Sequence, residues 1–438
     1  MNVDLILTAP WIVPVEPHGV VLEGHALVVH EGRIVALLPE DEARAAYRPD
    51  ATEHFEDHVL IPGLINAHTH AAMSLLRGYA DDLPLMEWLQ EHIWPAEGKW
   101  VGPEFVHDGT LLACAEMIRG GVTCFNDMYF FPLDAARAIE AAGMRAALSL
   151  VILDFPTAWA ENADEYFERA LDVHGDLKGR PLLTTTLAPH APYSVSDDSF
   201  GRIVDLAEFL DVPIHIHVHE TEGEVTAAVA KNGMRPLARL KGLGLMTDRL
   251  LAVHMTQLTG EEIGELAASG ARVVHCPEAN LKLASGFCPV QTLLDAGVDV
   301  ALGTDGPASN NDLDMFGEMR TAALLAKGVS GDATAVPAAR ALHMATLAGA
   351  RALGIHGDTG SLEPGKSADI VAVDLGGLES RPVHDPISQL VYVTGRDRVT
   401  DVWVAGRRLL QRRNLTTVDE REIIARARSW QERMSAEQ

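Results

Sequence analysis

The sequence predicts an α/β protein, a (β/α)8 TIM-type barrel joined to a small β-sandwich domain that both chain ends build. From about residue 61 to residue 359, apolar runs of strand length alternate with amphipathic stretches of helical length, which is the pattern of a parallel sheet. Eight strands can be counted there, the number that closes such a barrel. Almost every one ends on a polar or ionisable residue, at the edge where these barrels carry their active sites.

The eight expected strands are apolar runs, most of them bounded by Gly, Pro or polar residues. In chain order they are "GLINAHTH" (63–70), "VTCFNDM" (122–128), "MRAALSLVI" (144–152), "LLTTTLAPH" (182–190), "VPIHIHVHE" (212–220), "RLLAVHM" (249–255), "ARVVHCP" (271–277) and "VDVALGTD" (298–305). Parallel neighbours need long crossover connections, and the stretches between these runs supply them.

Both ends of the chain have a different pattern. Residues 1–60 offer short alternating strands separated by Gly and Pro, with one helix in "PEDEARAAY" (39–47). Residues 360–438 return to short strands, as in "SADIVAVDL" and "VTDVWVAGRRLLQ", and finish on "DEREIIARARSWQERM", which predicts an exposed helix. Since chain termini often lie close together, we expect 1–60 and 360–438 to form one small β domain beside the 61–359 barrel.

Composition narrows the class of ligand. The chain has 35 Lys plus Arg against 62 Asp plus Glu, a formal net charge of −27, which repels nucleic acids and anionic membranes. No window approaches the roughly 20 apolar residues that a membrane helix needs, and the four cysteines lack paired spacing. We therefore expect a cytoplasmic protein with no nucleic-acid or membrane partner and with a neutral or cationic small-molecule substrate.

The first expected strand ends in "NAHTH", which places His68 and His70 one residue apart. Side chains alternate along a strand, so both imidazoles lie on the same face and can converge on one metal ion. Taken alone, the pair is equally compatible with histidines that hydrogen bonds satisfy in the barrel mouth. Further ligands are needed to decide between the two readings.

The fifth expected strand supplies three more histidines. It reads "HIHVHE", in which His215, His217 and His219 share a face and Glu220 follows at the strand end. Three histidines stacked inward are a poor hydrophobic core, because buried polar groups cost free energy unless specific partners satisfy them. A hydrogen-bonded polar ladder is the structural alternative to a functional site.

The sixth and eighth expected strands end on His254 and Asp305. An aspartate at that place can also cap a helix or start a turn, and by itself Asp305 favours that reading. In one barrel mouth, however, the His68 and His70 pair, one histidine of the fifth strand and Asp305 form a mixed nitrogen and oxygen ligand set. Such a set suits zinc or another divalent transition metal.

Longer motifs resemble the amidohydrolase superfamily over essentially the whole chain. Those shared with the superfamily are "PGLINAHTH", "HIHVHE", "AVH", "GTDG" and "GSLEPGKSADIVAVD". Others are similar to its branch of S-methylthioadenosine/S-adenosylhomocysteine deaminases, namely "HTHAAMSLLRGYADDLPLMEWL", "APHAPYSV", "NLKLASGFCPV" and "TDGPASNNDLDMFGEMR". The resemblance implies a metal-dependent hydrolytic deaminase.

By this resemblance, one divalent metal ion is bound by His68, His70, His217 and Asp305. Superfamily members with two metals bridge them by a modified lysine at the end of the fourth strand, where this chain has His190, so one ion is expected. Zinc is the expected ion, and iron, manganese and nickel suit the same ligands.

The resemblance also implies catalytic roles. Glu220 is the proton shuttle, which protonates the purine ring and then assists the departure of ammonia. His254 contacts the water that attacks the ring. Asp305 accepts a proton from that water in addition to binding the metal.

For the substrate, the resemblance places His190 on a purine ring nitrogen and Glu97 on the ribose hydroxyls. Taken alone, Glu97 reads as an ordinary solvated helix residue. Relatives that accept the homocysteine carboxylate are expected to carry arginines near the end of the third strand, where this chain has Leu150 and no arginine before Arg169. Leu150 and Trp159 suit an apolar methylthio group instead.

The sequence therefore predicts a deaminase that converts 5′-methylthioadenosine to 5′-methylthioinosine and ammonia, with weaker S-adenosylhomocysteine or adenosine activity. Its rivals in the superfamily are guanine or other aminopurine deaminases and triazine chlorohydrolases. A rival of another class is a metal-free relative that serves as an interaction scaffold. We expect a homo-oligomer, a dimer, because closed dimers are the commonest symmetric assembly.

Overall fold

The computed structural model describes residues 1–436, and within this range it confirms the predicted barrel. One eight-stranded sheet runs in chain order with every neighbouring pair parallel. Its strands are β7 (Leu64–Thr69), β8 (Val122–Tyr129), β9 (Arg145–Ile152), β10 (Leu183–Pro189), β11 (Ile214–Val218), β12 (Leu250–His254), β13 (Arg272–His275) and β14 (Val300–Leu302). The Asp305 N–H donates to the His68 carbonyl over 3.0 Å, which brings the last strand to the first.

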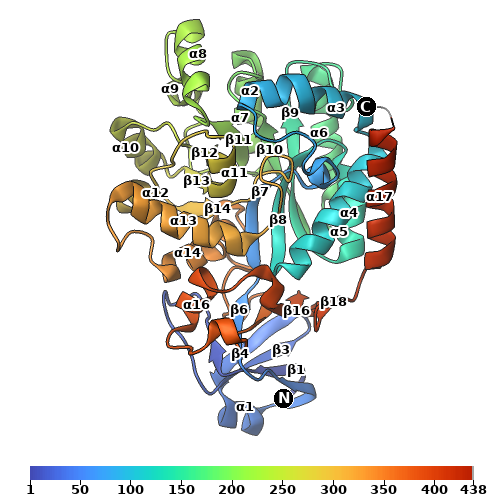
Figure 1. The fold of residues 1–438 in the computed structure, drawn as a ribbon, viewed down its shortest axis with the longest axis vertical. Coiled ribbons are helices and arrows are strands. Elements are labelled where there is room, and N and C mark those ends of the chain that lie inside the picture. The colour runs from blue at the N-terminus through green and yellow to red at the C-terminus, as the bar shows by residue number, and fades with distance from the viewer. Residues whose placement is uncertain (437–438) are drawn as a thin grey trace.

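Helices follow the strands and surround the barrel (Figure 1). They are α4 (Pro103–Arg119), α5 (Pro132–Ala142), α6 (Ala163–Leu177), α7 (Asp197–Leu210), α8 (Glu222–Asn232), α9 (Pro236–Gly242), α10 (Gly260–Ser269), α11 (Pro277–Lys282), α12 (Val290–Asp295), α13 (Met315–Ser330), α14 (Ala338–Met344) and α15 (Leu347–Ala352). Side-chain caps start several of them: Asn162, Ser196 and Thr221 each accept a backbone N–H of the first turn. Thr259 and Glu262 form a capping box on α10.

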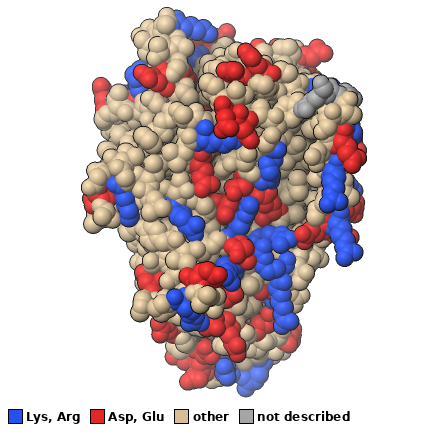
Figure 2. Space-filling model, in the orientation of Figure 1, with Lys and Arg blue, Asp and Glu red and all other residues tan. Residues whose placement is uncertain are grey.

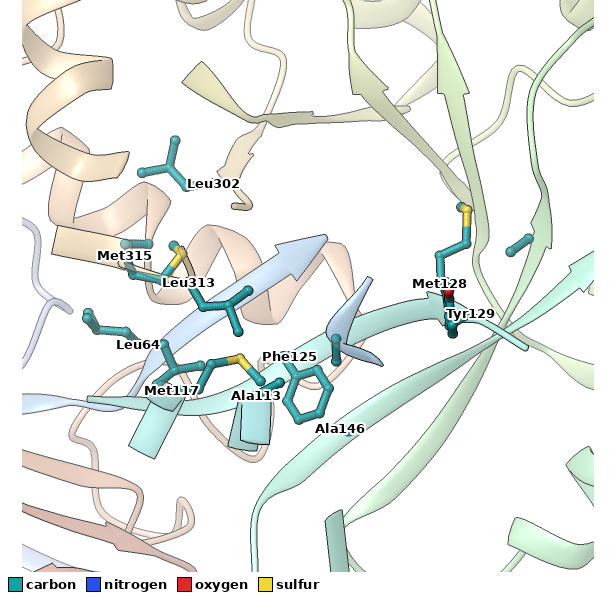
Figure 3. Packing of buried hydrophobic residues seen from close by; sticks show 14 of the residues in the cluster. Leu64, Ala113, Met117, Phe125, Met128, Tyr129, Ala146, Leu302, Leu313 and Met315 are labelled. Carbon is teal, nitrogen blue, oxygen red and sulfur yellow. The ribbon is translucent and has the colours of Figure 1, made fainter. Parts of the chain in front are cut away.

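Apolar side chains fill the space between the barrel and its helices. Figure 3 shows Leu64 of β7, Phe125 of β8 and Met117 of α4 in one cluster of buried residues. Each of these three side chains is fully buried. Burial of a large apolar side chain stabilises the fold by about 1.5–3 kcal/mol, so the layer between strands and helices stabilises the barrel.

Two further sheets form the predicted β-sandwich. One has the order β4-β3-β1-β5 and the other the order β18-β17-β16-β15-β6-β2. The strands are β1 (Asn2–Thr8), β2 (Trp11–Ile12), β3 (His25–His30), β4 (Arg33–Pro39), β5 (Arg48–His54), β6 (His58–Pro62), β15 (Ile370–Asp374), β16 (Val399–Val404), β17 (Arg407–Gln411) and β18 (Asn414–Leu415). Antiparallel pairing of β6 with β15 joins the two chain ends. Leu27 and Trp403 belong to the apolar core between the sheets.

The final helix, α17 (Glu420–Ser435), packs on the barrel helix α4 (Figure 1). Trp430 is buried and its ring meets that of Phe105 edge to face, with the centroids 5.3 Å apart. The indole N–H donates to Asp108, which also pairs with Arg426 at 2.7 Å. The expectation of an exposed helix is therefore wrong for the face that carries Trp430. The division at residues 60 and 359 stays a prediction.

Short helices cover the barrel mouth between β7 and α4. They are a 3-10 turn (Ala71–Leu76), α2 (Leu85–Glu87), a π-helical segment (Trp88–Ile93) and α3 (Trp94–Trp100). In Figure 1, α2 and α3 lie at the end of the barrel opposite the β-sandwich. Outside the barrel, α1 (Glu40–Ala46) confirms the helix expected near residue 40, and α16 (Pro386–Tyr392) precedes β16.

Charged side chains of both signs share the surface seen in Figure 2, where basic groups gather over the C-terminal segment and α17. Arg119 pairs with Glu420 and Arg396 with Glu116, each at 2.7 Å. These arginines are therefore held in ion pairs with acidic side chains of neighbouring elements. Among residues 1–436, every helix is too short or too polar to cross a membrane.

Candidate metal centre and active site

A cavity of about 360 Å³ opens at the carboxyl ends of the barrel strands. Its lining brings together residues from most of the strands and from the short helices over the mouth. The sequence-predicted site residues among them are His70, Glu97, His190, His217, Glu220, His254 and Asp305. Since this is the edge at which such barrels carry active sites, the cavity is the candidate site.

Four of the predicted side chains converge at the floor of this cavity. One potential ligand atom from each of His68, His70, His217 and Asp305 lies within 4.8 Å of the others. Asp305 Oδ1 is 3.2 Å from Nε2 of His68 and 3.2 Å from Nε2 of His70. His217 Nε2 is likewise 3.2 Å from His68 Nε2.

These separations fit a single cation. Ligands placed about 2.0–2.1 Å from a tetrahedral zinc ion are roughly 3.3 Å apart. Burial lowers the pKa of His68 to about 4 and that of His217 well below its usual range, so both imidazoles are neutral and keep a lone pair for a metal. The donor set, three imidazole nitrogens and one carboxylate oxygen, suits a divalent transition metal.

The other ring nitrogen of each histidine has a partner that orients it. His70 Nδ1 lies 2.6 Å from the Met128 carbonyl, and His217 Nδ1 lies 2.8 Å from the His190 carbonyl. A carbonyl only accepts, so both Nδ1 atoms carry a proton and both Nε2 atoms face the ligand cluster. Burial lowers the pKa of His70, but Asp305 outweighs burial and raises it, so a cation bound there displaces a proton from Nε2. His68 differs, because its Nδ1 lies 3.0 Å from Nε2 of His215.

Several residues at the strand ends have left-handed backbone conformations. The φ angles are 55° at His219, 74° at His254 and 61° at Asp305. Such conformations cost on the order of 1–3 kcal/mol each and concentrate at functional sites. At His219 the turn ends the strand alternation, and its Nε2 accepts the Leu237 N–H. The expectation that His219 shares a face with His217 is therefore wrong.

Acid and base groups lie beside the ligand cluster. Glu220 is buried, and burial raises the pKa of its carboxyl although nearby His254 opposes the rise. Its Oε2 is 3.9 Å from His254 Nε2, and its Oε1 accepts a hydrogen bond from Ser285 over 3.4 Å. His254 Nδ1 is fixed by Asn280 Oδ1 at 2.9 Å. A carboxyl with a raised pKa beside a ligand cluster is equipped to hold and deliver a proton.

The model of the Amidohydrolase family matches residues 59–409. The chain belongs to the amidohydrolase family. A curated 5-methylthioadenosine/S-adenosylhomocysteine deaminase of Teredinibacter turnerae is 49% identical over 435 residues, covering 99% of this chain and 98% of the relative.

Solved structures agree with this family. An adenosine deaminase of Xanthomonas campestris with bound zinc is 56% identical, with a TM-score of 0.98 and 99% of each chain covered. An atrazine chlorohydrolase variant of Arthrobacter aurescens, solved with zinc, is 24% identical with a TM-score of 0.90. It covers 97% of this chain and 99% of its own, and at this identity it shows the shared fold alone.

Two of the four predicted substrate residues of this amidohydrolase, Glu97 and His190, line the cavity. Glu97 lies on α3, and its Oε1 accepts a hydrogen bond from the Tyr129 hydroxyl over 2.7 Å. Burial of this carboxyl raises its pKa to about 7. His190 follows β10, its Nδ1 is 3.1 Å from Ser194 Oγ, and burial lowers its pKa to about 3.

The other two predicted substrate residues are not among those that line the cavity. Ser149 hydrogen-bonds inside the barrel, so the alternation of β9 turns its neighbour Leu150 to the other face. Trp159 instead contacts the Phe131 ring, at a centroid distance of 5.1 Å, and lies under Arg169. The apolar cavity wall is built by Trp88, Trp94, Val151, Leu153, Phe155 and Pro156.

Sequence reasoning missed the groups that hold the site residues in place. Tyr129 donates a hydrogen bond to Glu97. In the sequence, the one feature that could have drawn attention to Tyr129 is its position directly after the expected strand 122–128. Ser309 donates to Asp305 Oδ2 over 2.7 Å, and Asn280 fixes His254. Tyr129 ends β8, Asn280 lies on α11 and Ser309 follows Asp305 by four residues, so no shared motif marks these partners and only the fold reveals them.

Proposed function

We propose that this amidohydrolase is a metal-dependent deaminase that converts 5′-methylthioadenosine to 5′-methylthioinosine and ammonia, with weaker S-adenosylhomocysteine or adenosine activity. The observation that carries the proposal is the buried Glu220 carboxyl, with its raised pKa, next to the His68, His70, His217 and Asp305 cluster. Relatives of nearly equal length that bear the deaminase name support it.

We assign the metal to the four clustered side chains. A bound divalent cation supplies Lewis acidity, which lowers the pKa of water from 15.7 toward about 7. Asp305 Oδ2 is occupied by Ser309, which leaves Oδ1 toward the three histidines. Zinc is the proposed ion, and iron, manganese and nickel fit the same donors.

The protein groups then carry the protons. Asp305 and His254 orient the attacking water and take up its proton as its oxygen bonds to purine C6. Glu220 delivers its proton to the ring nitrogen N1, regains one from the water, and passes it to the amino group as the C6–N bond breaks. The proton held by Asp305 and His254 then passes to Glu220, so each residue returns to its starting protonation state. The products are the 6-oxopurine in its keto form, with a proton on N1, and ammonia.

The proposed substrate contacts follow from the cavity wall. Glu97 accepts hydrogen bonds from the ribose hydroxyls, and His190 contacts a purine ring nitrogen. Among residues 1–436, none of the side chains that line the cavity is an arginine or a lysine. The homocysteine carboxylate thus lacks the bidentate guanidinium partner that such groups prefer, whereas a methylthio group meets apolar side chains.

The test is ammonia release by zinc-loaded protein, measured as kcat/KM for methylthioadenosine, S-adenosylhomocysteine, adenosine and guanine. We expect methylthioadenosine to be preferred at least tenfold, about 1.4 kcal/mol in transition-state binding. A preference for guanine contradicts the assignment and favours a guanine deaminase. In a separate assay with a chlorinated triazine, chloride release without turnover of any purine favours a triazine chlorohydrolase. No turnover of any of them favours the scaffold alternative.

We further propose a cytoplasmic homodimer. The four cysteines of the chain are free and buried, which suits a reducing compartment; they are Cys114, Cys124, Cys276 and Cys288. Closed two-fold assemblies are the commonest form of homo-oligomer. Sedimentation velocity of the purified protein tests the dimer: a single species of about 95 kDa, twice the 47.3 kDa chain, is expected, and a 47.3 kDa species contradicts it.

A further inference from the structure

Beneath the ligand cluster, a chain of buried polar side chains fills the barrel interior. His215 of β11 lies between His68 and a group formed by Asn126, Ser149 and Thr186. All of these side chains are fully or almost fully buried. A buried polar network is retained only where its members satisfy one another, so its hydrogen-bond directions carry information.

The backbone carbonyl of Ala67 fixes the direction of the hydrogen bonds at one end of this network. Asn126 Nδ2 donates to the Ala67 carbonyl over 3.2 Å, which turns Asn126 Oδ1 toward Ser149. Ser149 donates to that oxygen over 2.9 Å, so its own oxygen accepts. His215 Nδ1 is 3.1 Å from this Ser149 oxygen and donates to it. His215 Nε2 then accepts from His68 Nδ1 at 3.0 Å.

The result at the far end is a free lone pair on His68 Nε2, the atom that faces Asp305 and His217. The opposite polarity is also available, because Asn126 Nδ2 lies 3.1 Å from the same His215 Nδ1 and can only donate. That polarity puts a proton on His215 Nε2 and on His68 Nε2, and it blocks the ligand atom. Ser149 is the group that accepts from His215 and selects the productive polarity.

We propose that His215 is a positioning residue for the metal centre, which with Ser149 and Asn126 holds the tautomer of His68 that binds the cation. His70 and His217 need no such device, because backbone carbonyls fix their Nδ1 protons. His68 rests on a second imidazole, which can accept or donate, so its tautomer depends on the network beneath it. This role rests on the metal site of the proposed function, but not on the identity of the substrate.

The test measures zinc affinity of the metal-free protein by competition with a chromophoric chelator. His215→Leu removes the acceptor and is expected to weaken zinc binding about 10–100-fold, as loss of a partner behind a metal ligand typically does. His215→Gln keeps an acceptor near the Nε2 position and is expected to bind within about fivefold of the parent. His275→Leu is the matched control, because His275 is equally buried on β13 and its Nδ1 lacks a hydrogen-bond partner within residues 1–436.

Zinc binding by His215→Leu within threefold of the parent overturns the proposal. So does equal weakening in His215→Gln, which assigns the effect to altered packing. If His215→Leu does not fold by circular dichroism, Ser149→Ala decides: weaker zinc binding by threefold or more supports the role, and unchanged binding overturns it. If the parent itself binds no zinc, the metal site of the proposed function fails, and this result is distinct from the others.

Discussion

The two walls of the cavity differ in how strongly the chain constrains them. One wall holds His70, His217 and Asp305, with the fully buried His68 in contact with Asp305 behind them, and a hydrogen-bond partner orients each of the four. A second wall is apolar, with Val151, Leu153 and Phe155 supplied by β9 and the segment after it. In the proposed function, the first wall supplies the groups for hydrolysis and the second supplies the shape that selects the substrate.

The difference indicates which wall can change while the fold is kept. The atrazine chlorohydrolase and the zinc-containing adenosine deaminase share the fold of this chain. A polar wall with interlocking hydrogen bonds tolerates little change, because each lost partner leaves a buried group unsatisfied. An apolar wall tolerates exchange of side chains at small cost if volume is kept. Substitutions on each wall should therefore have separable effects.

The largest effect is expected on the polar wall. Glu220→Gln keeps the size of the side chain but removes the proton, so kcat for methylthioadenosine should fall about 10²–10⁴-fold. Zinc content and thermal stability should stay near those of the parent, because Glu220 is not one of the clustered ligands. Glu222→Gln, at an exposed position on α8, is the control. Retained turnover in Glu220→Gln means that another group moves the proton.

A smaller effect is expected on the apolar wall. Phe155→Arg places a guanidinium at a partly exposed lining position and should shift kcat/KM toward S-adenosylhomocysteine by about tenfold relative to methylthioadenosine. Phe155→Leu should leave the ratio of the two substrates within about threefold of the parent. An unchanged ratio in Phe155→Arg places the carboxylate elsewhere in the cavity.

Glu97, which also lines the cavity, should make folding stability depend on pH. Its pKa is raised from 4.5 to about 7 in the folded protein, so the folded chain keeps a proton that the unfolded chain releases. Folding stability from this group is thus present below pH 4.5 and is lost as pH rises toward 7. As the pH rises from 5 to 8, the Tm of Glu97→Gln should increase relative to the Tm of the parent. Exposed Glu91→Gln is the control, and a pH-independent difference contradicts the shift.

The smallest effect is expected at Trp159, which the structure places outside the cavity lining. Its ring packs with Phe131 and Arg169, so Trp159→Phe should change the ratio of kcat/KM values for the two substrates less than twofold. If the ratio changes more than twofold while Phe155→Leu leaves it unchanged, Trp159 does contact the substrate.

The barrel was predictable because its strands are apolar runs with clear ends. The metal cluster was predictable because "NAHTH", "HIHVHE" and "GTD" fall at strand ends, which a closed barrel brings together. Leu150 was misplaced because alternation fixes which residues share a face, whereas only the Ser149 hydrogen bond shows which face points inward. His215 is one of three similar histidines in the expected fifth strand. Its hydrogen bond to His68 could not be predicted, because only the folded barrel brings the two rings together.

The most direct test of the account is a zinc titration of the metal-free protein, followed by ammonia release from methylthioadenosine. The four clustered side chains form one site, so activity should rise in proportion to zinc and stop at one ion per chain. Activity that needs a second zinc ion, or full activity in the metal-free protein, contradicts the single-metal deaminase proposed here.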